Sequence, residues 1–98
     1  MIPGVRFHPE ADLELNETAD FYDHERPGLG TDFLDEVDRA LRGVVEHPMA
    51  APLALGSTRN LVLSRFPYSV MYYIGDDEIV VSAIAHQRRR PYYWRDRT

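Results

Sequence analysis

Residues 59–98 read RNLVLSRFPYSVMYYIGDDEIVVSAIAHQRRRPYYWRDRT, in which three apolar runs are separated by turn residues. Residues 61–66 and 68–74 predict two strands joined at Pro67, and Gly75 with the two acids after it predicts a turn. Residues 79–85 are almost all apolar and β-branched, which is typical of a central strand covered on at least one face. The stretch therefore predicts consecutive antiparallel strands that end in a cationic segment.

Charge is divided unevenly along the chain. Residues 59–98 hold seven Arg and four acidic residues, whereas residues 1–58 hold four Arg and twelve acidic residues, within a net charge of −5. Cations gathered into one segment of an acidic protein indicate one anion-seeking surface.

Composition limits the classes of function. A chain of 98 residues with 44% hydrophobic content predicts a single domain over residues 1–98 with one small core. There is no Cys, and the four His residues lie too far apart for metal-ligand spacing, so we expect no metal and no cofactor. No apolar run approaches the roughly 20 residues that span a bilayer, and no signal peptide is visible, so we expect a cytoplasmic protein. All eleven basic residues are Arg, so lysine chemistry is excluded.

The first half of the chain predicts an edge strand and two helices. Residues 5–8 suit a short strand, Pro9 suits a first helical turn, and Ala11, Leu15, Ala19 and Tyr22 form one helical face. Residues 27–30 (PGLG) predict a tight link.

A second helix is expected to begin near Thr31 or Asp32 and to end before Pro48. Residues 49–58 predict a loop. The order is then β-α-α-β-β-β, an α+β fold in which a helical hairpin packs on a mainly antiparallel four-stranded sheet.

The ordered combination of motifs along nearly the whole chain resembles the RelE/ParE toxin superfamily of bacterial type II toxin–antitoxin modules. The residues that carry the resemblance are Ala11, Glu14-Leu15, Ala19, Tyr22, Pro27-Gly28-Leu29-Gly30, Phe33-Leu34, Val37, Arg59, Arg65-Phe66-Pro67-Tyr68, Tyr72, Ile84, His86, Arg89 and Pro91-Tyr92-Tyr93-Trp94. The resemblance implies the same fold. It also implies a small antitoxin partner whose disordered C-terminal segment folds across the toxin and silences it.

The superfamily is divided by activity. ParE-like members inhibit DNA gyrase, and RelE-like members cleave mRNA within the ribosome. The tail of this chain resembles ParE-like sequences, because the lysines of cleaving toxins are absent and His86 is followed by Gln87 rather than by a terminal Tyr. The leading interpretation is a ParE-like toxin that binds gyrase. The alternatives are a metal-independent, ribosome-dependent mRNA endonuclease and a family member without toxicity.

Several residues are candidates for target binding, and each has a structural alternative. Arg65 could hold a phosphate or pair with a helix acid, and His86 could be a general base or bond to the backbone. The nuclease alternative takes His86, Arg65 and Arg89 as catalytic. The full candidate set for toxicity is Arg59, Arg65, His86, Arg88, Arg89, Arg90, Tyr92, Tyr93 and Trp94.

The arginine run and the aromatics are open to two interpretations as well. If residues 88–90 continued the strand, Arg89 would point away from its two neighbours, and at least one of the three is expected to bind an anion. Tyr92, Tyr93 and Trp94 could stack on bases, or could pack on the sheet or on a protein partner. We also expect an exposed apolar groove, bordered by the two helices and the sheet, that an antitoxin segment fills.

Overall fold

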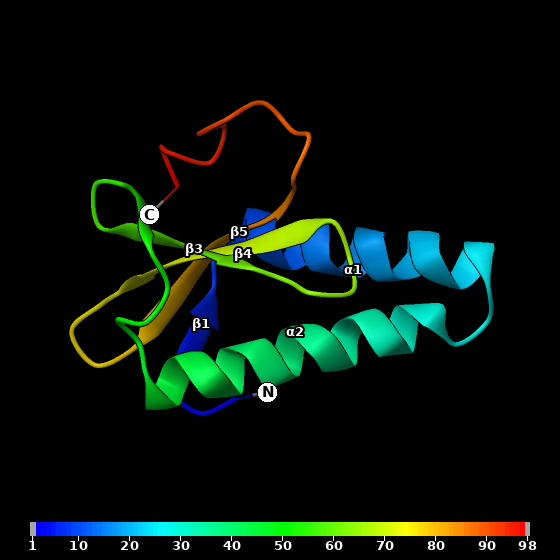
Figure 1. The fold of residues 1–98 in the computed structure, drawn as a ribbon, viewed down its shortest axis with the longest axis horizontal. Coiled ribbons are helices and arrows are strands. Elements are labelled where there is room, and N and C mark those ends of the chain that lie inside the picture. Colours follow the sequence, from blue (N-terminus) through cyan, green and yellow to red (C-terminus); the bar gives the residue numbers. More distant parts are fainter. Residues whose placement is uncertain (1, 98) are drawn as a thin grey trace.

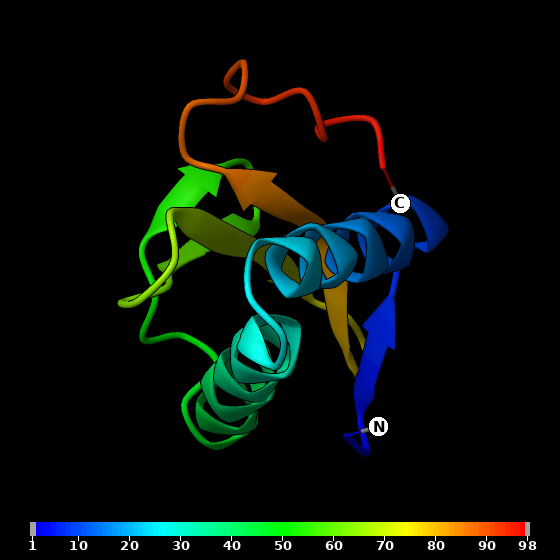
Figure 2. The ribbon, with the colours of Figure 1, turned by 90° about the vertical axis from the view of Figure 1, so that its right-hand side faces the viewer.

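The computed structural model describes residues 2–97 and shows a helical hairpin on one face of a five-stranded sheet (Figures 1 and 2). The elements are β1 (Val5–Phe7), α1 (Pro9–Glu25), α2 (Leu29–Glu46), β2 (Leu53–Leu55), β3 (Thr58–Val62), β4 (Tyr68–Ile74) and β5 (Ile79–His86). The strand order is β1-β5-β4-β3-β2, and β1 with β5 is the parallel pair. The predicted α+β fold is confirmed, with one strand more than expected.

The additional strand is β2, within residues 49–58 that were predicted as a loop. It has three residues between Pro52 and Gly56, which is too short to show an alternating pattern. It pairs antiparallel with β3 through Leu53 and Arg59.

The predicted start of the second helix was wrong by two or three residues. Gly28, with φ of 90°, is the N-cap, and α2 begins at Leu29 rather than near Thr31 or Asp32. The Gly30 N–H donates to Asp23 Oδ1 at 2.8 Å, which satisfies one of the amides that a helix start leaves unpaired. A Cβ at Gly30 would collide with the Ala19 carbonyl oxygen, so this glycine lets the two helices approach closely.

The strand predicted over residues 61–66 begins earlier, at Thr58, and also ends earlier, at Val62. The early end is explained by Glu36 of α2, which is only 6% exposed. Its Oε2 accepts the Ser64 N–H at 2.9 Å and the Arg65 N–H at 3.0 Å, so these amides serve a turn and not the sheet. The predicted strands at 68–74 and 79–85 are confirmed, and β5 extends through His86.

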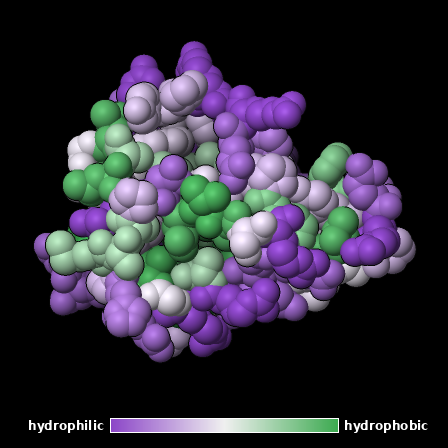
Figure 3. Space-filling model, in the orientation of Figure 1, coloured by the Kyte–Doolittle hydropathy of each residue, from purple (hydrophilic) through white to green (hydrophobic). Residues whose placement is uncertain are grey.

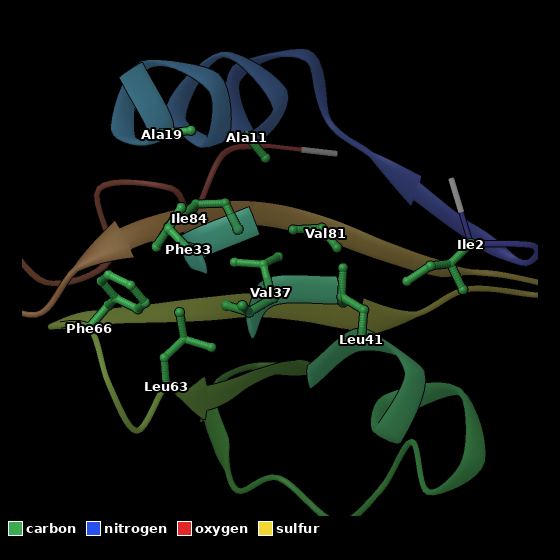
Figure 4. Close-up of a cluster of buried hydrophobic side chains, with 11 residues drawn as sticks. Ile2, Ala11, Ala19, Phe33, Val37, Leu41, Leu63, Phe66, Val81 and Ile84 are labelled. Atoms are coloured by element: carbon green, nitrogen blue, oxygen red, sulfur yellow. The ribbon is translucent and has the colours of Figure 1, made fainter. Parts of the chain in front are cut away.

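The core lies between the hairpin and the sheet. Figure 4 shows Phe33, Val37 and Leu41 of α2 pointing toward Val81 and Ile84 of β5. Seven of the eight residues of β5 are buried, because the helices cover one face and a smaller cluster around Trp94 covers the other. Within residues 2–97, neither helix is both long and apolar enough to cross a membrane.

Candidate functional site

The chain turns sharply where β5 ends, and this turn places the three consecutive arginines. The Gln87 N–H donates to the Pro67 carbonyl at 2.9 Å, and the Arg89 N–H donates to the His86 carbonyl at 2.9 Å. His86 Nδ1 accepts the Arg88 N–H at 3.0 Å. The chain therefore turns after His86, and the strand does not continue through residues 88–90, which are called here the arginine turn.

The side chains of the arginine turn differ in their surroundings. The Arg89 guanidinium lies 4.0 Å from the centre of the Tyr93 ring, a cation–π contact. Arg88 and Arg90 are exposed, and neither makes an ion pair within the part of the chain that the structure describes. Both cations are thus available to a partner.

The three aromatic residues of the tail (residues 87–97) have three different environments. Trp94 is 5% exposed and packs against Met71, Ala83 and Ala85, so in this conformation it cannot stack on a base. The Tyr93 hydroxyl donates to a carboxylate on α1. Tyr92, with φ of 61°, is 44% exposed and is therefore the aromatic residue of the tail most open to a partner.

A polar cavity of about 420 Å³, called here the tail pocket, lies between the tail and the sheet face that the helices leave open. Its floor includes Ser69 and Asn60, and the buried Asn60 Oδ1 has no hydrogen-bond partner among the described residues. His86, Arg89 and Arg90 line its rim. Cationic groups at the edge of a polar cavity suit an anionic partner.

Arg59 and Arg65 do not reach this pocket. Arg59 Nη1 donates to the carbonyls of Met49 at 3.0 Å and Ala51 at 2.7 Å, which fixes the loop before β2. Arg65 Nη2 lies 3.7 Å from Asp32 Oδ2, so Arg65 forms the ion pair with a helix acid that was one of its two alternatives. The structure therefore brings together His86 and the arginine turn and separates them from Arg59 and Arg65.

A second cavity has the opposite character. It has a volume of about 860 Å³ and lies between α1, α2 and β1. This cavity is called the groove. Its lining is mainly apolar and includes Val5, Phe7, Leu15, Leu34, Val37 and Leu41. Asp12 of α1 and Asp38 of α2 also line it. Figure 3 shows a further apolar area in the middle of another face, surrounded by hydrophilic side chains.

Sequence reasoning missed the carboxylate that organises the tail. Glu14 of α1 was not among the candidate residues for target binding, yet its side chain bonds to both Tyr93 and Arg97. Burial, followed by the bond to Glu14, raises the pKa of the Tyr93 hydroxyl above its ordinary value. Burial alone would lower the pKa of Arg97, but the bond to Glu14 and its charge outweigh burial, and the net pKa is raised.

A protein-family model described as the ParE toxin of the type II toxin–antitoxin system parDE matches residues 5–91. The chain belongs to the ParE toxin family. No curated protein gave a significant match. The interpretation as a ParE-type toxin is thereby confirmed at the level of the family.

One similar solved structure is described as the chromosomal ParDE TA system from P. aeruginosa. It superimposes with a TM-score of 0.73 over 85% of this chain and 94% of that chain, at 20% sequence identity. This similarity confirms the fold. The match to the ParE family model ends at residue 91, so Tyr93, Trp94 and Arg97 lie beyond the part of the chain that the family model covers.

Proposed function

We propose that this ParE-family toxin inhibits growth in the cytoplasm by binding DNA gyrase through the arginine turn and the tail pocket, and that an antitoxin segment silences it from the groove. The observation that carries the proposal is the set of unpaired cations at the end of β5. Arg88 and Arg90 are exposed without an ion pair among the described residues, in a protein whose net charge is −5. The choice of gyrase comes from the family.

The groove supports the antitoxin part of the proposal. It is hollow and largely apolar, and Leu34 on its wall is 37% exposed. A disordered segment that folds on binding gains most from such a surface, and coupled folding of this kind buries roughly 1,000 Å² or more. Arg6, Asp12 and Asp38 flank the apolar lining, and Asp38 is already paired with Arg42 at 2.9 Å. Asp12 has no ion pair among the described residues, so we expect apolar residues in the centre of the segment and one Arg or Lys that faces Asp12.

The geometry of His86 favours target binding over RNA cleavage. In a neutral imidazole one nitrogen accepts and the other donates. Here Nδ1 already accepts the Arg88 N–H at 3.0 Å, so Nε2 carries the proton. Neither nitrogen then has a free lone pair with which to take a proton from a ribose hydroxyl. Arg65, the second member of the nuclease alternative, is paired with Asp32 away from the tail pocket.

The test compares two activities of the purified toxin. We expect it to block gyrase supercoiling and to leave ribosome-bound mRNA intact. The variant His86→Gln serves as the control, since a nuclease that uses His86 as its base would lose activity in it. Clean mRNA cleavage that disappears in His86→Gln would overturn the proposal in favour of the endonuclease.

A second experiment tests the assigned surface. Replacing Arg88, Arg89 and Arg90 together by Ala is expected to remove growth inhibition in cells that express the toxin without an antitoxin. The matched control replaces Arg39 and Arg42 by Ala, two cations on the exposed side of α2. If the triple variant folds and stays fully toxic, the surface is elsewhere, and Arg59 and Arg65 are the next residues to replace.

A further inference from the structure

A single carboxylate holds the tail against the body of the protein. Glu14 Oε1 accepts the Ile84 N–H at 3.0 Å and Arg97 Nη1 at 2.9 Å. Glu14 Oε2 accepts Arg97 Nη2 at 3.0 Å and the Tyr93 hydroxyl at 2.9 Å. Each oxygen thus receives two donors, and the guanidinium of Arg97 binds in the two-pronged geometry that is strongest for a carboxylate. Glu14, Tyr93 and Arg97 are called the clasp below.

The clasp occupies the place where β5 loses its strand partner. β1 ends at Phe7, whose register partner is Val81, so the edge of β5 beyond this point has no neighbouring strand. Glu14 supplies an acceptor for the buried Ile84 N–H, and Arg97 donates to the Ser82 carbonyl at 3.0 Å. The side chains of the clasp therefore replace the main-chain bonds of a missing strand, which gives the tail one defined docking position.

The clasp also fixes the arginine turn from its far end. His86 anchors the start of the tail through β5, and Tyr93 anchors it to α1. The Tyr93 ring lies 4.0 Å from the Arg89 guanidinium and 5.1 Å from that of Arg97. Two cations of like charge at one ring repel each other, and the nearby Glu14 carboxylate offsets this repulsion.

We propose that Glu14 is a positioning residue for the toxic surface, which it shapes by clasping Tyr93 and Arg97 so that the arginine turn is preorganised before the target arrives. The inference rests on the proposed function of the arginine turn. A turn whose two ends are fixed loses little conformational freedom on binding, so a released tail would bind the same target more weakly. Glu14 lies within residues 5–91, whereas its two partners Tyr93 and Arg97 lie beyond the part of the chain that the family model covers.

The position of the tail can be measured separately from toxicity. Trp94 is the single tryptophan of the chain, and it lies in the tail among Met71, Ala83 and Ala85. Its fluorescence therefore reports tail docking directly. The variants are Glu14→Gln, which still accepts the Ile84 N–H but cannot hold the guanidinium by two charged oxygens, and Arg97→Gln. The matched controls are Glu25→Gln and Arg26→Gln, two exposed residues at the end of α1 and outside the tail.

We expect both clasp variants to shift Trp94 emission to longer wavelength, to increase its quenching by acrylamide, and to reduce growth inhibition about tenfold or more, as for a binding surface that has lost its preorganisation. Arg97→Lys, which keeps the charge and one donor, is expected to fall between wild type and Arg97→Gln. The two controls are expected to match wild type in emission and toxicity.

The outcomes separate the clasp from the proposed function. Unchanged Trp94 emission in both clasp variants would show that Glu14 does not hold the tail and would overturn the inference. A red shift with full toxicity would overturn the positioning role. In that second case the variant lacking Arg88, Arg89 and Arg90 decides whether the proposed surface fails too. If this variant loses toxicity, the arginine turn remains the proposed target-binding surface. If it stays fully toxic, both that surface and the positioning role of Glu14 are overturned.

Discussion

The groove and the tail pocket lie in different parts of the fold and differ in the force that would hold a partner. Apolar side chains such as Leu15, Leu34 and Leu41 line the groove, whereas His86, Arg89 and Arg90 line the rim of the tail pocket. Burial of apolar surface is non-directional and scales with area, so it suits a segment that folds as it binds. Charge acts at longer range and selects partners by sign, so it suits a preformed anionic surface.

The contrast implies that the two surfaces can be damaged separately. A binding partner in the groove contacts the helices and β1, while a partner at the tail pocket contacts the end of β5. An antitoxin segment that binds in the groove, as proposed above, would therefore not need to cover the arginine turn, because displacement of the tail or distortion of the sheet end would also silence it.

The largest effect is expected from a charge placed in the groove. Leu34→Arg puts a cation on an apolar wall that a partner must bury, and it should weaken antitoxin binding by about 30-fold or more, the loss typical of a central interface residue. Growth inhibition without antitoxin should persist. Titration calorimetry measures the affinity. Val45→Arg is the matched control, because Val45 is an exposed residue of α2 that does not line the groove. Equal losses in both variants would contradict the assignment of the groove.

The next effect concerns the hairpin that forms two walls of the groove. Gly30→Ala forces a Cβ into the Ala19 carbonyl, and overpacking of this kind costs about 1–3 kcal/mol. Gly43→Ala is the control within the same helix. Its new Cβ meets open space, and Ala in a helix interior is more stable than Gly by roughly 0.5–1 kcal/mol. Denaturant unfolding should thus give opposite signs for the two variants. A stabilising Gly30→Ala would show that the helices can separate at no cost.

The sequence predicted the elements whose patterns are local and missed those whose partners are distant. The strand at 68–74 and the apolar face of α1, formed by Ala11, Leu15, Ala19 and Tyr22, follow from residues within a few positions of one another. Glu14, in contrast, bonds to Ile84, Tyr93 and Arg97, which are 70, 79 and 83 residues away. An acid in the first turns of a helix is also what the helix dipole favours, so its sequence context gave no signal of a second role.

In the candidate site, too, local sequence patterns were predictable and contacts between distant residues were not. Composition and charge located the cationic segment, and the turn after His86 confirmed that arginines gather at the end of β5. The side-chain directions could not be predicted, because they depend on the Gln87–Pro67 and Arg88–His86 bonds that end the strand. Asn60 gave no sequence signal, since the burial of its Oδ1 without a partner among the described residues depends on how distant segments pack.

A smaller effect, and one confined to the tail, is expected from Tyr93→Phe. The variant removes the hydroxyl bond to Glu14, which should lower stability by about 1 kcal/mol at neutral pH. The folded pKa of Tyr93 is raised above its unfolded value of about 10, so its contribution is complete below that pH and is lost as pH rises through the folded pKa. The difference in unfolding free energy between wild type and variant should therefore shrink above pH of about 10. A constant difference would show that Tyr93 ionises normally.

The smallest effect on stability is expected at the arginine turn itself, where binding and folding should be uncoupled. Arg88 and Arg90 make no ion pair among the described residues, so Arg88→Ala with Arg90→Ala should change the free energy of unfolding by less than about 0.5 kcal/mol. Arg89 is left in place because it contacts the Tyr93 ring. Salt screens charges beyond roughly 8 Å at physiological ionic strength, so inhibition of gyrase should weaken with added salt in wild type and respond less in the double variant. Antitoxin affinity should be the same in both. A double variant that unfolds more easily would show that these arginines stabilise the fold. A double variant that loses antitoxin binding and inhibition together would show that the groove and the arginine turn act as one surface.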